Sequence, residues 1–239
     1  MKPIAVLFTT AILVTSSATF SCPQNYALIA PLAPYTTSHF LISQYEMRQG
    51  VNNLPEPTIT GIPWHLPRNQ AEASCQSIGM RLPTNAEWQT MARQAEYVAA
   101  NWTGGQPGAG FLKADITYLP NGSVLFNLGD SVWEQVAGDL TGETGNGGPI
   151  YLVNGITNPA TVTVGGVSNS VKYHFGPQDG YVTYPYNPGL GILTNRYSQS
   201  IMRGGDDEEP GFFGTAVNHG PTDMSNDIGF RCVTSISSP

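Results

Sequence analysis

Charge is scarce in this 239-residue chain, because Asp, Glu, Lys and Arg together make up only 11% of it. Its 10 basic residues form no basic run and the net charge is −7, so we expect no nucleic-acid partner. The hydrophobic fraction of 40% is enough to build a core, which argues against a disordered chain. The composition therefore indicates a globular protein that does not bind nucleic acid.

Long hydrophobic runs are also lacking, apart from residues 4–14 near the N-terminus. This run is too short to span a bilayer, and it follows the positively charged Lys2, as in a secretory signal peptide. An ordinary buried N-terminal strand is the alternative interpretation. We expect residues 1–21 to be a signal peptide, the mature chain to be exported to the periplasm, the cell surface or the medium, and residues 22–239 to form one domain. No other stretch is apolar for long enough to predict a transmembrane helix.

Cysteine is rare, with three residues in the whole sequence. An odd number leaves one cysteine without an internal partner. Cys22 stands at the expected cleavage site and could carry a lipid anchor, although the residues before it form a poor lipobox. Because export permits disulfides, we pair Cys75 with Cys232.

Glycine and proline are abundant, at 27 and 19 residues, so the sequence predicts a turn-rich fold with few long helices. The clearest helix runs from about residue 85 to 100. It starts at a capping box, in which Thr84 and Glu87 can satisfy each other's backbone N–H groups. A preceding helix should place Ala71, Cys75 and Ile78 on its inner face and end at Gly79. Side chains at helical spacing in the later helix form an apolar stripe: Trp88, Met91, Ala92, Ala95, Val98 and Ala99.

The remaining apolar segments are short and predict strands separated by loops. The predicted strands and one hairpin cover residues 26–33, 40–47, 150–167 (the hairpin), 200–203, 211–217 and 228–233. Helices and strands together give an α+β fold.

Several short motifs occur in an order that resembles the formylglycine-generating enzyme (sulfatase-modifying factor) family. The resemblance extends from about residue 40 to 233 and implies a C-type-lectin-like fold, with two helices, small twisted antiparallel sheets and extensive irregular loops. It also supports the Cys75–Cys232 pairing, because family members join the cysteines of these two motifs. The motifs are residues 40–47, Pro63-Trp64, Arg81-Leu82-Pro83-Thr84-Asn85-Ala86-Glu87-Trp88, Val132-Trp133-Glu134, Arg203-Gly204-Gly205 and Gly229-Phe230-Arg231-Cys232.

One departure from the family pattern decides the expected chemistry. The family's oxidase reaction uses two copper-binding cysteines shortly after the Arg-Gly-Gly motif, but no cysteine lies between Gly205 and Ile228. Without a thiol pair a soft-metal site cannot be built. We therefore expect no copper and no catalytic residue. A formylglycine-generating type of maturation enzyme remains the alternative from a different class.

The same fold is used by a non-enzymatic branch, the variable proteins of diversity-generating retroelements, which resemble this sequence in organisation. In those proteins a ligand-binding surface lies between Arg-Gly-Gly and the final Gly-Phe-Arg, which corresponds here to residues 206–227. An ordinary acidic loop is the other interpretation, and we expect one of the two phenylalanines to belong to the core. The predicted ligand-binding residues are Asp206, Asp207, Glu208, Phe212, Phe213, Asn218, His219, Thr222, Asp223, Ser225 and Asn226.

The resemblance also implies a calcium site near Val132-Trp133-Glu134. Oxygen ligands of the kind that Ca²⁺ prefers would come from Asn127, Asp130, Val132 and Glu134. Asp130 stands where the family usually has glycine, and Glu134 could instead only tie down the loop through hydrogen bonds.

These observations lead to one functional hypothesis and two alternatives. We expect an exported ligand-binding protein that recognises a protein or a glycan through residues 206–227. The alternatives are the maturation enzyme described above and a structural adhesion subunit that uses the same surface for a fixed partner.

Overall fold

The computed structural model describes most of the chain: residues 23–110, 112–113, 115–129, 131–141, 150–151, 161–176, 192–193, 200–205, 211–216 and 219–236. The expected signal peptide and Cys22 lie outside these residues. Within them the fold is mixed α and β, as predicted. None of the described helices is both long and apolar enough to cross a membrane.

Three α-helices and two short 3₁₀ helices are described: α1 (Arg68–Ser77), α2 (Asn85–Glu96), α3 (Val171–Phe175), η1 (Val51–Asn53) and η2 (Ala99–Asn101). Helix α1 buries Ala71 and Cys75 and is followed by Gly79, whose φ of 73° is left-handed, as expected of a residue just after a helix. Helix α2 starts at the predicted capping box.

Helix α2 ends four residues earlier than predicted. The side chain of Asn101 donates to the carbonyl oxygen of Ala95 at 2.8 Å, and the Trp102 indole donates to that of Glu96 at 2.8 Å. These side chains satisfy carbonyl groups that have no partner at a helix end, so the chain can turn into η2 at this point.

Fifteen strands are described, most of them short. They are β1 (Tyr26–Ile29), β2 (Phe40–Ser43), β3 (Met47–Gln49), β4 (Pro55–Pro57), β5 (Ile116–Tyr118), β6 (Val124–Phe126), β7 (Trp133–Thr141), β8 (Ile150–Tyr151), β9 (Thr161–Val164), β10 (Val167–Ser170), β11 (Ile192–Leu193), β12 (Ser200–Arg203), β13 (Thr215–Ala216), β14 (Ile228–Phe230) and β15 (Val233–Ser235).

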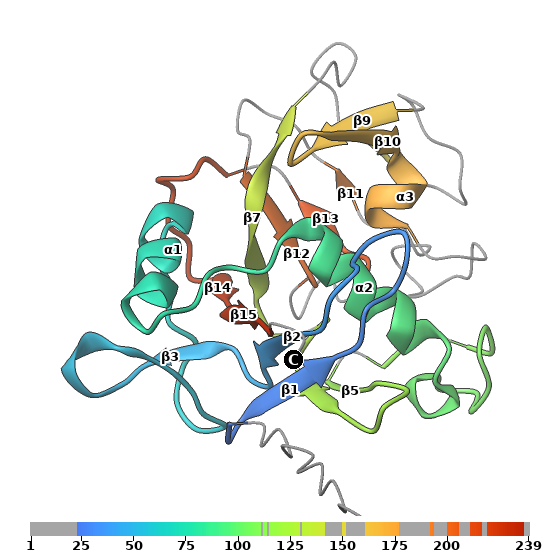
Figure 1. Cartoon of the computed structure of the whole chain (residues 1–239), viewed down its shortest axis with the longest axis horizontal. Helices are drawn as coiled ribbons and strands as arrows, with labels where there is room; N and C mark the ends of the chain where they lie inside the picture. The colour runs from blue at the N-terminus through green and yellow to red at the C-terminus, as the bar shows by residue number, and fades with distance from the viewer. Residues whose placement is uncertain are drawn as a thin grey trace, which may run out of the picture.

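Strand β7 organises the largest sheet and runs through the middle of the molecule in Figure 1, with α1 to its left and α2 to its right. The order of this sheet is β10-β9-β7-β12-β13, and β14 also pairs with β7. A separate sheet has the order β1-β2-β15, and three further pairs join β3 with β4, β5 with β6 and β8 with β11. The sheets are small, as the resemblance implied. Their pairing is antiparallel except that β14 runs parallel to β7.

The predicted strand 40–47 is divided into β2 and β3 because the backbone between them bonds elsewhere. Arg231 donates to the carbonyl oxygens of Ser43 and Gln44, at 3.2 and 2.7 Å. The N–H of Gln44 donates to the carbonyl of Asn25. A buried arginine therefore replaces ladder hydrogen bonds at this point, which a local sequence pattern cannot reveal.

The main hydrophobic core lies around the inner face of α2. Trp88, Met91, Ala92 and Ala95 of the predicted stripe are all fully buried. Around them pack apolar side chains from β1, β2, β7 and β12 and from the segment just before β13. A second cluster surrounds Cys75 and the C-terminal strands.

Candidate functional site

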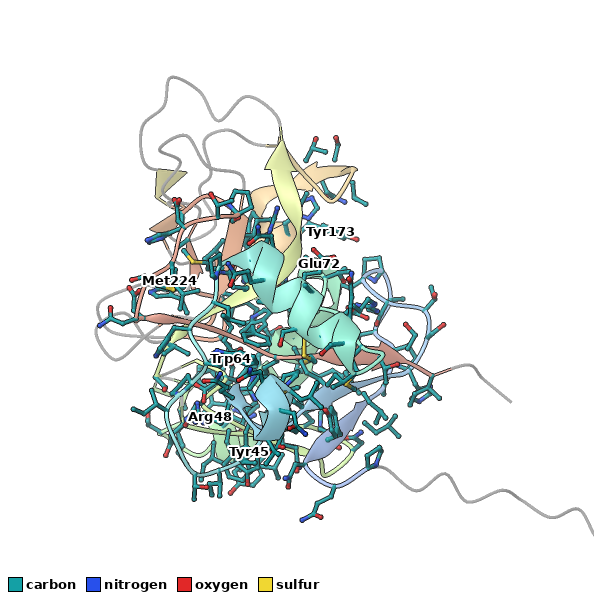
Figure 2. The ribbon with its side chains drawn as sticks, turned by 90° about the vertical axis from the view of Figure 1, so that its left-hand side faces the viewer. Tyr45, Arg48, Trp64, Glu72, Tyr173 and Met224 are labelled. Atoms are coloured by element: carbon teal, nitrogen blue, oxygen red, sulfur yellow. A yellow bond between two sulfur atoms is a disulfide. The ribbon has the colours of Figure 1, made fainter. Side chains whose placement is uncertain are left out.

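The predicted disulfide is present and fixes the C-terminal strands to α1. Cys75 and Cys232 are bonded, with their Cα atoms 5.5 Å apart, and both residues are fully buried. The bond lies behind α1 in the view of Figure 2. It joins positions 157 residues apart. It therefore fixes one end of the segment in which we predicted the ligand-binding residues.

The other end of that segment is fixed by Arg203, which is fully buried at the end of β12. Its guanidinium donates to the side-chain oxygens of Asn85 and Gln89 and to the carbonyl oxygens of His174 and Gly214. Burial lowers the pKa of Arg203 to about 9, and the nearby positive charge of Arg93 acts in the same direction. These bonds tie β12 to α2 and α3.

Asn85 reaches Arg203 because the capping box fixes the start of α2. The Thr84 hydroxyl accepts from the N–H of Glu87 at 3.2 Å, and the Glu87 carboxylate accepts from the N–H of Thr84 at 2.8 Å. Arg81 donates to both oxygens of that carboxylate, at 2.6 and 2.7 Å. The carboxylate thus links the Arg-Leu-Pro-Thr motif to the first turn of the helix.

Residues 206–210 and 217–218 lie outside the described residues. The predicted ligand-binding residues Asp206, Asp207, Glu208 and Asn218 belong to these segments, so their positions stay predictions.

The prediction that Phe212 and Phe213 form part of a ligand-binding surface needs correction, because both side chains are fully buried. We expected one of them in the core, and both are there. The carbonyl oxygen of Phe212 accepts from the Trp88 indole at 2.8 Å, and the Phe213 ring faces the Arg93 guanidinium at 5.9 Å. Both rings belong to the core cluster that contains the buried face of α2.

Residues 219–226, which we call the arm, carry the rest of the predicted ligand-binding residues. Their exposure differs: Thr222, Asp223 and Asn226 are exposed, whereas His219 and Ser225 are half-buried. Asp223 accepts from the N–H of Gly220 at 2.7 Å and so shapes a turn within the arm. The N–H of Asn69 donates to the carbonyl oxygen of Pro221, and this bond attaches the arm to the start of α1.

Met224, which the sequence analysis did not select, lies in the arm and is 69% exposed. Figure 2 shows it at the left, away from Tyr173 on the other side of α1. A large apolar side chain in this position adds a hydrophobic contact to the polar groups around it. Its signal in the sequence was weak, because a single Met in a polar loop is equally typical of a buried gap-filler.

Glu134, one of the predicted calcium ligands, is already in contact with a guanidinium group. Glu134 lies 2.7 Å from the Nε atom of Arg231, and both side chains are buried. Asn127 has a left-handed backbone (φ 54°), Val132 is buried and Asp130 lies outside the described residues. No group of three or more His, Cys, Asp or Glu side chains suited to a metal occurs among the described residues. This contact favours the interpretation in which Glu134 ties down the chain, and calcium binding stays a prediction.

A cavity near the start of α2 was not anticipated from the sequence. It has a volume of about 350 Å³ and is bounded by α2, α3, β7, the β9–β10 hairpin and the loop between β1 and β2. Two aromatic rings line it and contact each other: Tyr35 from the loop between β1 and β2, and Tyr173 from α3. Nothing in the local sequence signals this cavity, because its walls come from five separate segments.

In comparisons with known proteins, no family model matches this sequence and no curated protein matches it. The resemblance to the formylglycine-generating enzyme family therefore rests on the motifs alone.

Proposed function

We propose that this chain is an exported, non-catalytic binding protein with a C-type-lectin-like fold. In this proposal the exposed arm, residues 219–226, recognises a protein or a glycan. The predicted ligand-binding residues Asp206, Asp207, Glu208 and Asn218 belong to the same proposed surface. The proposed surface lies in the segment that was predicted from the sequence, residues 206–227, but it no longer includes Phe212 and Phe213.

The observation that carries the proposal is an exposed segment between two rigid anchors. Arg203 is held on one side by its bonds to α2 and α3, and Cys232 is held on the other by the disulfide. The N–H of Trp133 also donates to the carbonyl of Asp227 at 2.8 Å, at the point where the arm joins β14. Loops placed on a rigid scaffold carry many protein binding sites, because their side chains can vary while the core keeps the backbone in place.

The arm exposes uncharged polar and apolar side chains beside the carboxylate of Asp223. Thr222 and Asn226 supply hydrogen-bond donors and acceptors, and Met224 supplies an adaptable apolar contact. Small polar groups beside an apolar anchor are typical of adaptable binding surfaces.

The proposed absence of oxidase chemistry is supported by the disulfide. Three cysteines occur in the sequence, and the Cys75–Cys232 bond occupies two of them. Only the thiol of Cys22 is then left, and one thiol cannot form the pair that binds copper in the family.

The test compares two matched alanine variants of the full chain on a glycan array and on a panel of extracellular proteins. The first variant replaces Thr222, Met224 and Asn226 together. The control variant replaces Ile59 and Thr60, which are exposed in the loop after β4. Asp223 is left unchanged because its carboxylate shapes the arm.

We expect the arm variant to lose binding about tenfold or more to every probe that the wild type binds, since each removed contact contributes about 1 kcal/mol. The control variant should bind like the wild type, and both variants should keep its melting temperature. Equal binding by the arm variant and the wild type would exclude the arm as the recognition surface.

A further inference from the structure

The cavity beside α2 has the size of a small-molecule site. Its volume of about 350 Å³ lies at the lower end of the range of about 300–1,000 Å³ that is typical of ligand pockets. Ala86 on α2, Ala137 and Gly138 on β7, and Val164 on β9 leave the space open because their side chains are short or absent. A compact ligand of one or two rings would fill it.

Two of the polar side chains that line the cavity, Asn85 and Gln89, already have partners within the protein. Asn85 donates to the carbonyl of His174 at 2.9 Å and accepts from Arg203. Gln89 donates to the carbonyl of Gly176 at 2.7 Å and also accepts from Arg203. A strongly polar ligand would therefore lose its hydration without gaining equivalent hydrogen bonds from these two amides.

The hydroxyl groups at the cavity are engaged in the same way. The Tyr35 hydroxyl is hydrogen-bonded to Arg93 and Gln89, and the Tyr173 hydroxyl donates to the carbonyl of Pro34 at 3.4 Å. Thr84 is occupied by the capping box. None of the described residues that line the cavity is Asp, Glu, Lys or Arg, so no permanently charged side chain among them would stabilise a charged ligand.

Aromatic rings supply the surface that remains available. The rings of Tyr35 and Tyr173 lie 4.9 Å apart between centroids with a tilt of 38°, and both residues are half-buried. The His174 ring meets the Tyr173 ring edge to face, with centroids 5.0 Å apart. Aromatic groups favour tilted and edge-to-face contacts of this kind, so an additional ring can join the group without a hydrogen bond.

From the size, the satisfied polar groups and the aromatic rings, we propose that this cavity is a binding site for an uncharged aromatic small molecule of one or two rings. The site shares no lining residue with the arm, and Tyr173 of the site and Met224 of the arm lie on different sides of α1 in Figure 2. It is therefore a second site, and it does not depend on what the arm binds.

Indole is the probe for the first experiment, and indole-3-acetate is its charged counterpart. Both are titrated into the full chain by calorimetry, and ligand contacts are followed by NMR. Indole should bind and perturb the resonances of Tyr35 and Tyr173, whereas indole-3-acetate should bind at least about tenfold more weakly because its carboxylate would be desolvated without a partner. Absence of indole binding at millimolar concentration, or equal binding of the two probes, would overturn the proposal.

Two pairs of variants locate the site. Ala86→Leu projects a larger side chain into the cavity and should weaken indole binding about tenfold or more, whereas Ala73→Leu makes the same change at an exposed position of α1. Tyr173→Phe keeps the ring and should retain binding, whereas Tyr173→Ala removes the ring and should lose most of it. Each variant is first checked for an unchanged circular dichroism spectrum.

These pairs also distinguish the cavity from nonspecific adsorption. If Ala86→Leu binds indole like Ala73→Leu, the probe is bound elsewhere and the assignment of the cavity is wrong. If Tyr173→Phe loses binding as completely as Tyr173→Ala, the hydroxyl contact with Pro34 is what matters, and the aromatic contact is refuted.

Discussion

The Glu134 carboxyl and the Arg231 guanidinium are in contact and fully buried, with 2.7 Å between the Oε1 and Nε atoms. The pair joins β7 to the residue that follows β14, at the one parallel connection among the described strands. Arg231 also donates to the carbonyl oxygens of Ser43, Gln44 and Phe126. A single guanidinium thus ties the C-terminal motif to three other parts of the chain.

Burial of this pair leads to a pH-dependent stability. Removal from water raises the pKa of Glu134 from 4.5 to about 8, although the positive charge of Arg231 acts in the opposite direction. Between these values the folded protein keeps a proton that the unfolded chain releases. The stability that protonation of Glu134 contributes is therefore fully present below pH 4.5 and is lost as the pH rises through about 8. We expect the free energy of unfolding to fall by up to about 1.4 kcal/mol per pH unit in this range.

Urea denaturation of the Glu134→Gln variant at several pH values tests this expectation. A neutral amide cannot titrate, so the decline between pH 4.5 and about 8 should be much smaller than in the wild type. Glu72→Gln on the surface of α1 is the matched control and should keep the wild-type slope, since Glu72 is partly exposed. Parallel curves for the wild type and Glu134→Gln would show that another group causes the pH dependence.

The disulfide should account for a large part of the stability. Because Cys75 and Cys232 are 157 residues apart, the bond restricts a long loop in the unfolded chain. The chain-entropy model gives about 5 kcal/mol for a loop of this length. The double variant Cys75→Ser/Cys232→Ser should lose stability of this order in urea denaturation, whereas Cys22→Ser should not. Under denaturing, non-reducing conditions the wild type should show no more than one free thiol, and two or three would refute the bond.

Local sequence signals predicted those parts of the fold that are determined locally. The capping box at Thr84 and Glu87 was predicted correctly because both partners belong to the same helical turn. The buried stripe of α2 and the position of Gly79 followed from helical spacing and from the preference of glycine for a left-handed backbone.

Features that depend on distant contacts were missed or misplaced. Phe212 follows an acidic segment, and the sequence therefore favoured a place on the surface for it. In the structure Phe212 is buried, and its carbonyl oxygen accepts from Trp88, which is 124 residues away. The cavity depends on five segments that meet only in the folded chain. Arg203 was recognised as part of a motif, but its bonds to Asn85 and Gln89 could not be derived from local patterns.

Gly204 should tolerate no side chain. Its φ of 95° lies in a region that favours glycine, and a Cβ atom there would come within 2.6 Å of the Leu128 carbonyl oxygen and 3.2 Å of the Trp88 ring. We expect Gly204→Ala to reduce the free energy of unfolding by at least about 2 kcal/mol, because backbone strain and overpacking add.

Gly79→Ala is the matched control for this substitution. Gly79 also has a left-handed backbone, with φ of 73°, but a Cβ atom there would meet no atom within 4 Å. In urea denaturation of both variants, Gly79→Ala should reduce the free energy of unfolding by only about 1 kcal/mol, which is the cost of backbone strain alone. Equal costs at the two positions would mean that the contacts with Leu128 and Trp88 relax without penalty.

The Thr84 hydroxyl and the Glu87 carboxylate of the capping box should each contribute to stability, and separate substitutions can measure the two contributions. Thr84→Ala removes the hydroxyl that accepts from the Glu87 N–H and should cost about 1 kcal/mol. Glu87→Ala should cost more, about 2–3 kcal/mol, because it also removes the acceptor for the Thr84 N–H and for Arg81. Thr84→Ser keeps the oxygen and serves as the control, with stability close to that of the wild type. Chemical denaturation measures all three variants, and a Thr84→Ala variant as stable as Thr84→Ser would mean that water satisfies the first turn of α2 equally well.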